Sequence, residues 1–213
     1  MEETDGVLYV EGSSDYDLLK EWARVLDHPA KITLDDVCVH QINGRHPRDA
    51  RAHFFAIKAV RGNSKALLIL DGDNRNLPEH EILTDGLTIT RWTRYEVESY
   101  LLHPPALSRF VSGPVPDLFS EQRFNAGMEY LRDELPPAVI KDPLGNHDYL
   151  NSTPASKTIL PGYFSAAGID ISKNEYYQIA AQMEPTEIPN EIRDKLDLIH
   201  HVLGDLASRT SKI

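Results

Sequence analysis

Six acidic side chains come shortly after short runs of strand-like sequence, and they are the residues of this chain best placed to do chemistry. They are Glu11, Asp15, Asp71, Asp73, Glu96 and Glu98. Carboxylates held close together repel one another unless a proton or a cation intervenes. Hard divalent ions prefer such oxygen ligands. The acids therefore point to metal chemistry, provided that the fold brings them together.

The elements that must position these acids are strands of a parallel sheet. Residues 66–70 form an almost continuous apolar run, typical of a strand that is buried on both faces. Residues 6–10, 36–42 and 87–92 are expected to be three further strands, and helical spacing is present at about 15–26 and 48–60. Strands that alternate with helices predict βαβ units. Ligands bind at the carboxyl ends of strands in such sheets, which is where the acids lie.

Two details of this region are also predictions. The helix over 48–60 has one apolar face, made of Ala52, Phe55, Ala56 and Ala59. Residues 76–84 are expected to form a loop or a short helix, since Pro78 interrupts them.

The character of the chain changes at Pro104, where strand-like runs stop. Helical patterns follow at about 105–111, 117–135, 157–167, 174–182 and 190–208, and the last has an apolar face suited to a core. The turn-rich stretch 136–154 is predicted to be a mobile or DNA-facing loop. We therefore expect an α/β metal-binding domain over 1–103 and a helical domain over 104–213.

Composition sets limits on the class of protein. The 213 residues carry a net charge of -11 and include one cysteine, Cys38, which fits a reducing cytoplasm. No run is long enough for a membrane span, so we expect a cytoplasmic protein and no membrane partner. The acidic balance argues against broad electrostatic binding of nucleic acid, but not against a site that meets phosphate through divalent cations. The chain contains neither GxxxxGK[ST] nor GxGxxG.

Each candidate residue also has an ordinary explanation. Asp71-Gly72-Asp73 could be a polar turn, and Asp15 could be a first-turn acid that complements a helix dipole. Glu96 and Glu98 could belong to a solvated helix start. Lys157 opens a helix where a cation is unfavourable, so it is a candidate functional lysine, or else an exposed surface lysine. His40, His46 and His53 lack matched ligand spacing and are interpreted as ordinary histidines.

Taken together, the motifs resemble a known family. Glu11-Gly12 after a first strand and Asp71-Gly72-Asp73 after a third resemble a Toprim domain. The fuller pattern runs through Val10–Asp15, Leu70–Asp73 and Tyr95–Leu102. It resembles the C-terminal nuclease region of the OLD (overcoming lysogenization defect) endonucleases. Over 104–213 the resemblance is only the helical character and a candidate lysine.

This resemblance implies a Toprim-type, mostly parallel sheet flanked by helices, followed by a helical domain, and a DNA nuclease that uses two Mg²⁺ or Mn²⁺ ions. It implies that Glu11, Asp15, Asp71 and Asp73 bind metal, with Glu96 and Glu98 as ligands of the second ion or its surroundings. Glu11, Asp71, Asp73 and Lys157 are the implied catalytic residues, with Lys157 steadying charge on the scissile phosphate. An N-terminal ABC-type ATPase usually precedes this region in the family.

Several rivals stay open or are disfavoured by the order of the motifs. Receiver domains place an acid pair after the first strand, and haloacid-dehalogenase-type phosphatases place DxD there, whereas the pair here follows the third. An RNA-processing or primase-like Toprim activity remains an alternative, because the motif fixes metal chemistry and not substrate. A non-catalytic, metal-organised regulatory module is the other alternative.

Overall fold

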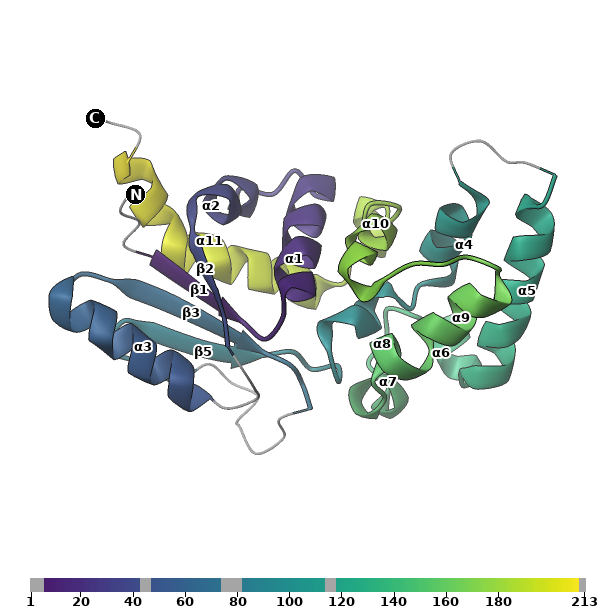
Figure 1. The fold of residues 1–213 in the computed structure, drawn as a ribbon, viewed down its shortest axis with the longest axis horizontal. Helices are drawn as coiled ribbons and strands as arrows, with labels where there is room; N and C mark the ends of the chain where they lie inside the picture. Colours follow the sequence, from purple (N-terminus) through teal and green to yellow (C-terminus); the bar gives the residue numbers. More distant parts are fainter. Residues whose placement is uncertain (1–5, 43–46, 74–81, 114–117, 211–213) are drawn as a thin grey trace.

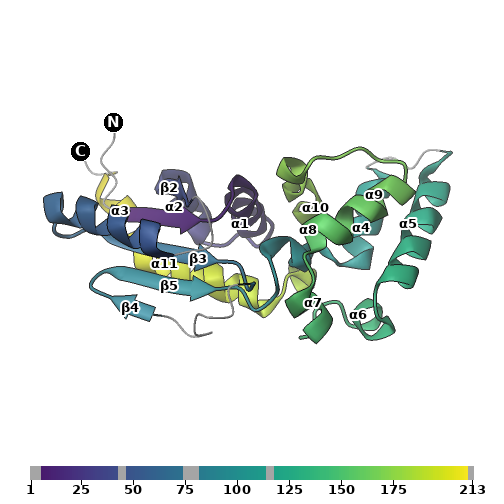
Figure 2. The same ribbon diagram turned by 60° about the horizontal axis from the view of Figure 1, so that its bottom comes forward.

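The computed structural model describes residues 6–42, 47–73, 82–113 and 118–210. Its five-stranded sheet has the order β2-β1-β3-β5-β4, and every pairing is parallel except that of β4 with β5 (Figures 1 and 2). The strands are β1 (Gly6–Val10), β2 (Cys38–Gln41), β3 (Lys65–Leu70), β4 (Ile82–Thr84) and β5 (Leu87–Arg91). The predicted α/β class and the mostly parallel sheet are confirmed.

Helices cover both faces of this sheet. Helices α1 (Ser13–Val25), α2 (Ala30–Asp36) and α11 (Asn190–Thr210) lie on one face, and α3 (Pro47–Val60) lies on the other (Figures 1 and 2). Alternate residues of β1 point to opposite faces, so Leu8 packs in the core under α1 while Tyr9 packs in the core under α3. The sheet is therefore buried on both sides, as its apolar strands require.

The remaining elements form a helical part, which lies beyond the carboxyl ends of the parallel strands (Figure 2). They are the 3₁₀ helix η1 (Val97–Leu101), α4 (Pro104–Ser112), α5 (Ser120–Glu134), α6 (Pro137–Lys141), α7 (Asp148–Ser152), α8 (Ala155–Thr158), α9 (Leu160–Ala166), η2 (Lys173–Glu175), α10 (Tyr177–Ala180) and η3 (Pro185–Glu187). One apolar core runs from the sheet, through η1, into these helices. Among the described helices, none combines the length and the apolarity that crossing a membrane requires.

The last helix returns to the sheet. Helix α11 contacts α2, β1 and β3, with Ile192, Leu196, Ile199 and Leu203 buried. The sequence division at residue 103 places this helix in the second domain, although it packs on the first. The two-domain division itself stays a prediction.

Three local expectations are wrong. Residues 82–84 form strand β4, joined to β5 by the two-residue turn Asp85-Gly86, in which both residues have positive φ. The rest of the predicted loop, 76–81, lies outside the described residues. The face of α3 that contains Phe55 is exposed, and Ala50 and Phe54 are buried instead. The stretch 136–154 is not one loop, because it contains helices α6 and α7.

Candidate active site

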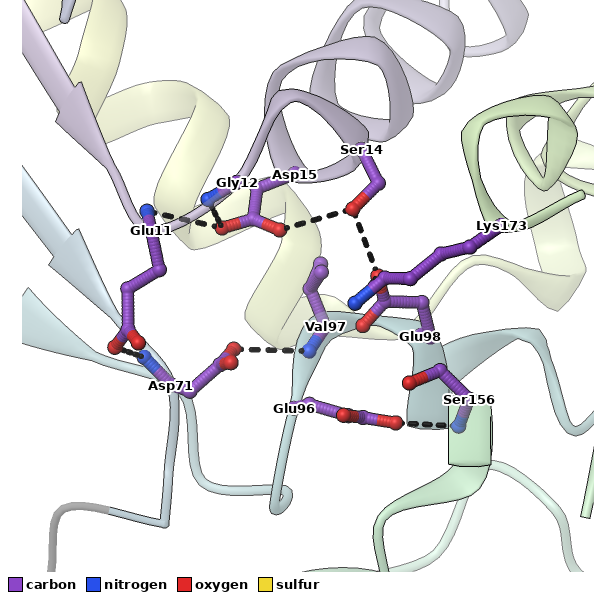
Figure 3. Close-up of polar contacts among 10 residues, drawn as sticks. All are labelled: Glu11, Gly12, Ser14, Asp15, Asp71, Glu96, Val97, Glu98, Ser156 and Lys173. Atoms are coloured by element: carbon purple, nitrogen blue, oxygen red, sulfur yellow. Dashed lines mark hydrogen bonds and ion pairs between the residues drawn. The ribbon is translucent and has the colours of Figure 1, made fainter. Parts of the chain in front are cut away.

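The carboxyl ends of the strands and the start of η1 bring the predicted acids to one place. Glu11 follows β1, Asp15 lies in the first turn of α1, and Asp71 follows β3. Glu96 and Glu98 lie at the N-terminal end of η1, after β5. Figure 3 shows these five side chains around one region, with Lys173 reaching toward Glu98 from η2. Sequence positions almost ninety residues apart thus share a single site.

Backbone amides fix the first two acids. Asp15 Oδ2 accepts hydrogen bonds from the backbone N–H groups of Glu11 and Gly12, both at 3.1 Å. Glu11 in turn accepts a hydrogen bond from the backbone N–H of Asp71 through Oε1, at 2.9 Å. Glu11 therefore ties the end of β1 to the end of β3, and α1 begins where Asp15 closes its first turn.

The turn after β3 requires a glycine, Gly72, between its two acids. A Cβ atom at this position would overlap the backbone carbonyl oxygens of Trp92 and Arg94, so only glycine allows the turn to pack this closely on the chain after β5. The Asp71 side chain then points at η1, where its Oδ1 accepts a hydrogen bond from the Val97 N–H at 3.3 Å. Asp73 is anchored by its backbone N–H, which donates to Tyr95 O at 3.0 Å.

Glu96 and Glu98 are the most deeply buried acids of the site, with 4% and 1% of their surface exposed. Glu96 accepts a short hydrogen bond from the backbone N–H of Ser156, at the start of α8. Glu98 Oε1 accepts hydrogen bonds from the Ser14 hydroxyl at 2.9 Å and from Lys173 Nζ at 2.8 Å. Helices α8 and η2 thus supply a backbone donor and a cation to two acids at the start of η1.

The pKa values record how poorly these charges are compensated. Burial, reinforced by the charges of Asp15, Glu11, Glu98 and Glu96, raises the pKa of Asp71 to about 9. Burial and the charge of Glu98 raise the pKa of Asp15 to about 7, against the lowering effect of the Gly12 N–H. Burial and Glu98 also raise the pKa of Glu96. At neutral pH the cluster therefore favours binding a proton or a cation.

Lys173 is the residue of this site that sequence reasoning missed. Burial lowers its pKa, but the charge and hydrogen bond of Glu98, and then Glu96 and Asp15, raise the pKa above its ordinary value. Lys173 follows Ser172 in a Ser-x-x-Glu capping box closed by Glu175. That motif predicts a helix start and gives no hint of a functional lysine.

Lys157 lies on α8, one residue after Ser156. Its side chain is exposed on α8, and within the described part of the chain it makes no hydrogen bond or ion pair. Its neighbour Ser156 touches the site through Glu96. The catalytic role predicted for Lys157 stays a prediction.

The donor set suits an oxygen-ligated divalent ion. The site offers carboxylate oxygens, which hard divalent ions prefer as ligands. One of them, the buried Oε2 atom of Glu98, has no hydrogen-bond donor and could accept an ion. With the side chains in their present rotamers, no three described His, Cys, Asp or Glu residues converge closely enough to hold one ion. Ion binding would therefore require the carboxylates to turn from their present hydrogen-bond donors. Glu11, Asp15, Asp71 and Glu98 are the residues best placed to do so.

Comparisons with known proteins add a likeness of fold. No family model and no curated protein matches this chain. Among solved structures, the C-terminal region of the Burkholderia pseudomallei OLD protein is similar, with a TM-score of 0.49 and 16% identity over 94% of this chain and 99% of that one. The C-terminal region of the Xanthomonas campestris pv. campestris OLD protein has a TM-score of 0.46 and 18% identity, over 96% of this chain and 98% of that one.

Both structures are C-terminal regions of OLD proteins, the family that the motifs resemble. At this identity and TM-score the likeness says nothing about activity, and the chemistry has to be argued from the site itself.

Proposed function

We propose that this chain is a divalent-metal-dependent nuclease that hydrolyses phosphodiester bonds of DNA. The observation that carries the proposal is the gathering of Glu11, Asp15, Asp71 and Glu98 at one sheet edge, where their mutual repulsion favours a bound cation. Perturbed acids of this kind cluster at functional sites. The motif resemblance suggests the reaction class, and the acids would bind the metal ions that this reaction needs.

Mg²⁺ or Mn²⁺ would be held by Glu11, Asp15, Asp71 and Glu98, with Asp73 and Glu96 beside them. When bound, such ions supply an activated water and positive charge for phosphodiester hydrolysis. The acidic chain can then meet a polyanion that it would otherwise repel. The N-terminal ABC-type ATPase that the resemblance implies stays a prediction about the full-length protein.

Two further residues, Lys173 and Ser14, have roles beside the acids in the proposed reaction. Lys173 carries a charged amino group at the edge of the acid cluster, paired only to Glu98 among the ion pairs of the described residues. A lysine so placed can stabilise negative charge on a phosphate in the transition state. We therefore assign to Lys173 the role that the sequence alone suggested for Lys157. Ser14, bonded to Glu98 and 3.4 Å from Asp15 Oδ1, keeps these two acids in register.

The test is incubation of the chain with supercoiled plasmid and Mg²⁺ or Mn²⁺, beside EDTA and beside Asp71→Ala/Asp73→Ala. We expect nicking or linearisation that requires the ion and is lost in the double variant. Glu121→Ala/Glu129→Ala, two acids of α5, removes the same number of charges from the helical part and serves as the matched control.

Three outcomes count against the proposal. Cleavage that survives EDTA would contradict metal dependence. Cleavage that survives the double variant would place the chemistry elsewhere. Cleavage of RNA with none of plasmid would replace the proposed substrate by that of an RNA-processing enzyme.

A further inference from the structure

A polar cavity opens directly beside the glycine of the acid pair. It has a volume of about 710 Å³ and is lined by Gly72, Arg91, Thr93, Asn146, Asp148, Asn151 and Ser152. Apart from the glycine, every lining residue has a polar side chain. This size lies within the roughly 300–1,000 Å³ range of small-ligand pockets. The cavity can therefore hold a group about the size of one nucleotide, read by hydrogen bonds.

Asn146 and Asn151 form an amide pair in this wall. Asn151 Nδ2 donates to Asn146 Oδ1 at 2.7 Å, which commits the oxygen of Asn146 and turns its NH₂ group to other acceptors. Asn146 itself is exposed. An exposed amide fixed by its own oxygen is a ready donor for an acceptor on a ligand.

The loop that carries Asn146 is held rigidly. Arg94, only 4% exposed, donates through Nη2 to the backbone oxygens of Pro143 at 2.7 Å and Gly145 at 3.2 Å, and through Nη1 to Ser99 O at 2.9 Å. Its guanidinium also lies over the Tyr100 ring, 4.6 Å from the centroid. Arg94 thus ties the loop before α7 to the element that carries Glu96 and Glu98, a supporting contact of the kind that makes a binding site precise.

A second cavity of about 370 Å³ adjoins the first, because Thr93 and Asn146 line both. Its other walls include apolar surfaces from Leu144, Ile188 and Pro189. A polar space beside the acids thus leads past Asn146 into a partly apolar one. An unpaired nucleic-acid strand has the same alternation, since flat apolar bases hang from a polar backbone.

We propose that these two joined cavities form a seat for an unpaired DNA strand next to the bond to be cut. The nucleotide nearest the cut occupies the cavity beside Gly72, and the next base occupies the cavity lined by Leu144 and Ile188. A base inside a duplex is stacked and paired, so it reaches neither cavity without leaving its partner. The inference rests on the proposed function, and it makes single-stranded or frayed DNA the preferred substrate.

Binding rather than cleavage tests this inference. In an Asp71→Asn/Asp73→Asn background, which removes two carboxyl groups and the cutting activity, the Kd of a fluorescein-labelled single-stranded oligodeoxynucleotide is measured by anisotropy, beside a blunt duplex of the same sequence. Asn146→Asp keeps the oxygen that Asn151 uses but removes the NH₂ donor and adds a charge. Asn125→Asp makes the same change at an exposed position of α5 and is the matched control.

We expect the single strand to bind more tightly than the duplex, and Asn146→Asp to weaken single-strand binding by about tenfold, the effect of about 1.4 kcal/mol. Asn125→Asp should leave the Kd within about twofold. Thr93→Glu, at the wall shared by both cavities, should weaken binding as Asn146→Asp does, while Thr93→Gln should do so much less. Circular dichroism and the melting temperature establish that each variant is folded.

Equal affinity for strand and duplex, no binding of the single strand, or an unchanged Kd in Asn146→Asp would overturn the inference. Because the readout needs no catalysis, its failure is separate from that of the proposed function. A chain that binds the strand at Asn146 but cuts no DNA would refute the nuclease and keep the seat.

Discussion

Partly buried carboxylates in two regions of this molecule, Glu187 and the acids at the strand ends, have opposite environments. Glu187 accepts hydrogen bonds from Arg109 and from the Glu184 N–H at 2.8 Å, and His103 lies 3.8 Å from its Oε1. Burial raises the pKa of Glu187, but these partners lower it below its ordinary value. Asp71 has one backbone donor and several acidic neighbours, and its pKa is raised to about 9.

We interpret the difference as that between a structural carboxylate and a carboxylate proposed to bind a cation. The protein itself compensates Glu187, which holds η3 to α4, so nothing needs to be added from outside. The negative charges of the acids at the strand ends are offset only in part by hydrogen-bond donors and by Lys173, so a bound proton or cation is needed to neutralise the rest. Burial of a carboxylate is therefore not enough to indicate a cation site; a shortage of hydrogen-bond donors and positive charges around it is the better indication. The predictions that follow test this contrast.

The largest effect is expected from Lys173, whose ammonium group pairs with Glu98 in the acid cluster. Lys173→Ala should lower the rate of metal-dependent DNA cleavage by about a hundredfold, since it removes a group that stabilises transition-state charge. Lys157→Ala, at an exposed lysine on α8, should change the rate by no more than about twofold. Initial rates on plasmid give both values. Equal losses in the two variants, or a larger loss in Lys157→Ala, would return the role to Lys157.

The next effect concerns stability without metal. At about pH 8 in EDTA, Asp71→Asn should raise the free energy of unfolding by about 1–3 kcal/mol, because folded Asp71 must hold a proton that the unfolded chain has released at this pH, whereas asparagine needs none. Glu187→Gln should lower the free energy of unfolding by a similar amount, about 1–3 kcal/mol, because Arg109 loses its charged partner. Urea titrations measure both. Destabilisation by both changes would show that the two groups of carboxylates are not different in kind.

A smaller effect is expected from pH. The folded state of Asp71 and Asp15 holds protons that the unfolded state has released, since their pKa values are raised to about 9 and about 7. Folding therefore binds protons between about pH 4 and pH 9, and stability falls as pH rises through this window. In EDTA we expect the melting temperature to decrease from about pH 6 to pH 9, and to decrease less in Asp71→Asn. A melting temperature that is level or rises over this range in the wild-type chain would oppose the assignment.

Much of the architecture can be read from the sequence, because buried parallel strands and their helices leave strong periodic signals. The strand before Asp71 and the apolar face of α11 are of this kind. Strand β4 is only three residues long, and its turn Asp85-Gly86 is the better signal for it. The buried face of α3 could not be chosen from periodicity, since Phe54 and Phe55 are adjacent and apolar on either reading.

The acids of the site were predictable for a topological reason, whereas its lysine was not. Carboxyl ends of parallel strands meet at one edge, so residues such as Glu11 and Asp71 converge whatever the loops do. Lys173 reaches the same place from a short 3₁₀ helix far along the chain, through packing that only the folded helical part defines. Local sequence around Lys157 and Lys173 does not separate the two.

Calorimetric titration of Mn²⁺ into the wild-type chain, Asp71→Asn and Glu187→Gln tests the central claim most directly. The account predicts saturable binding to the wild type that is lost or greatly weakened in Asp71→Asn and retained in folded Glu187→Gln. Absence of binding to the wild type, or undiminished binding to Asp71→Asn, would contradict the claim that the acids at the strand ends form a cation site.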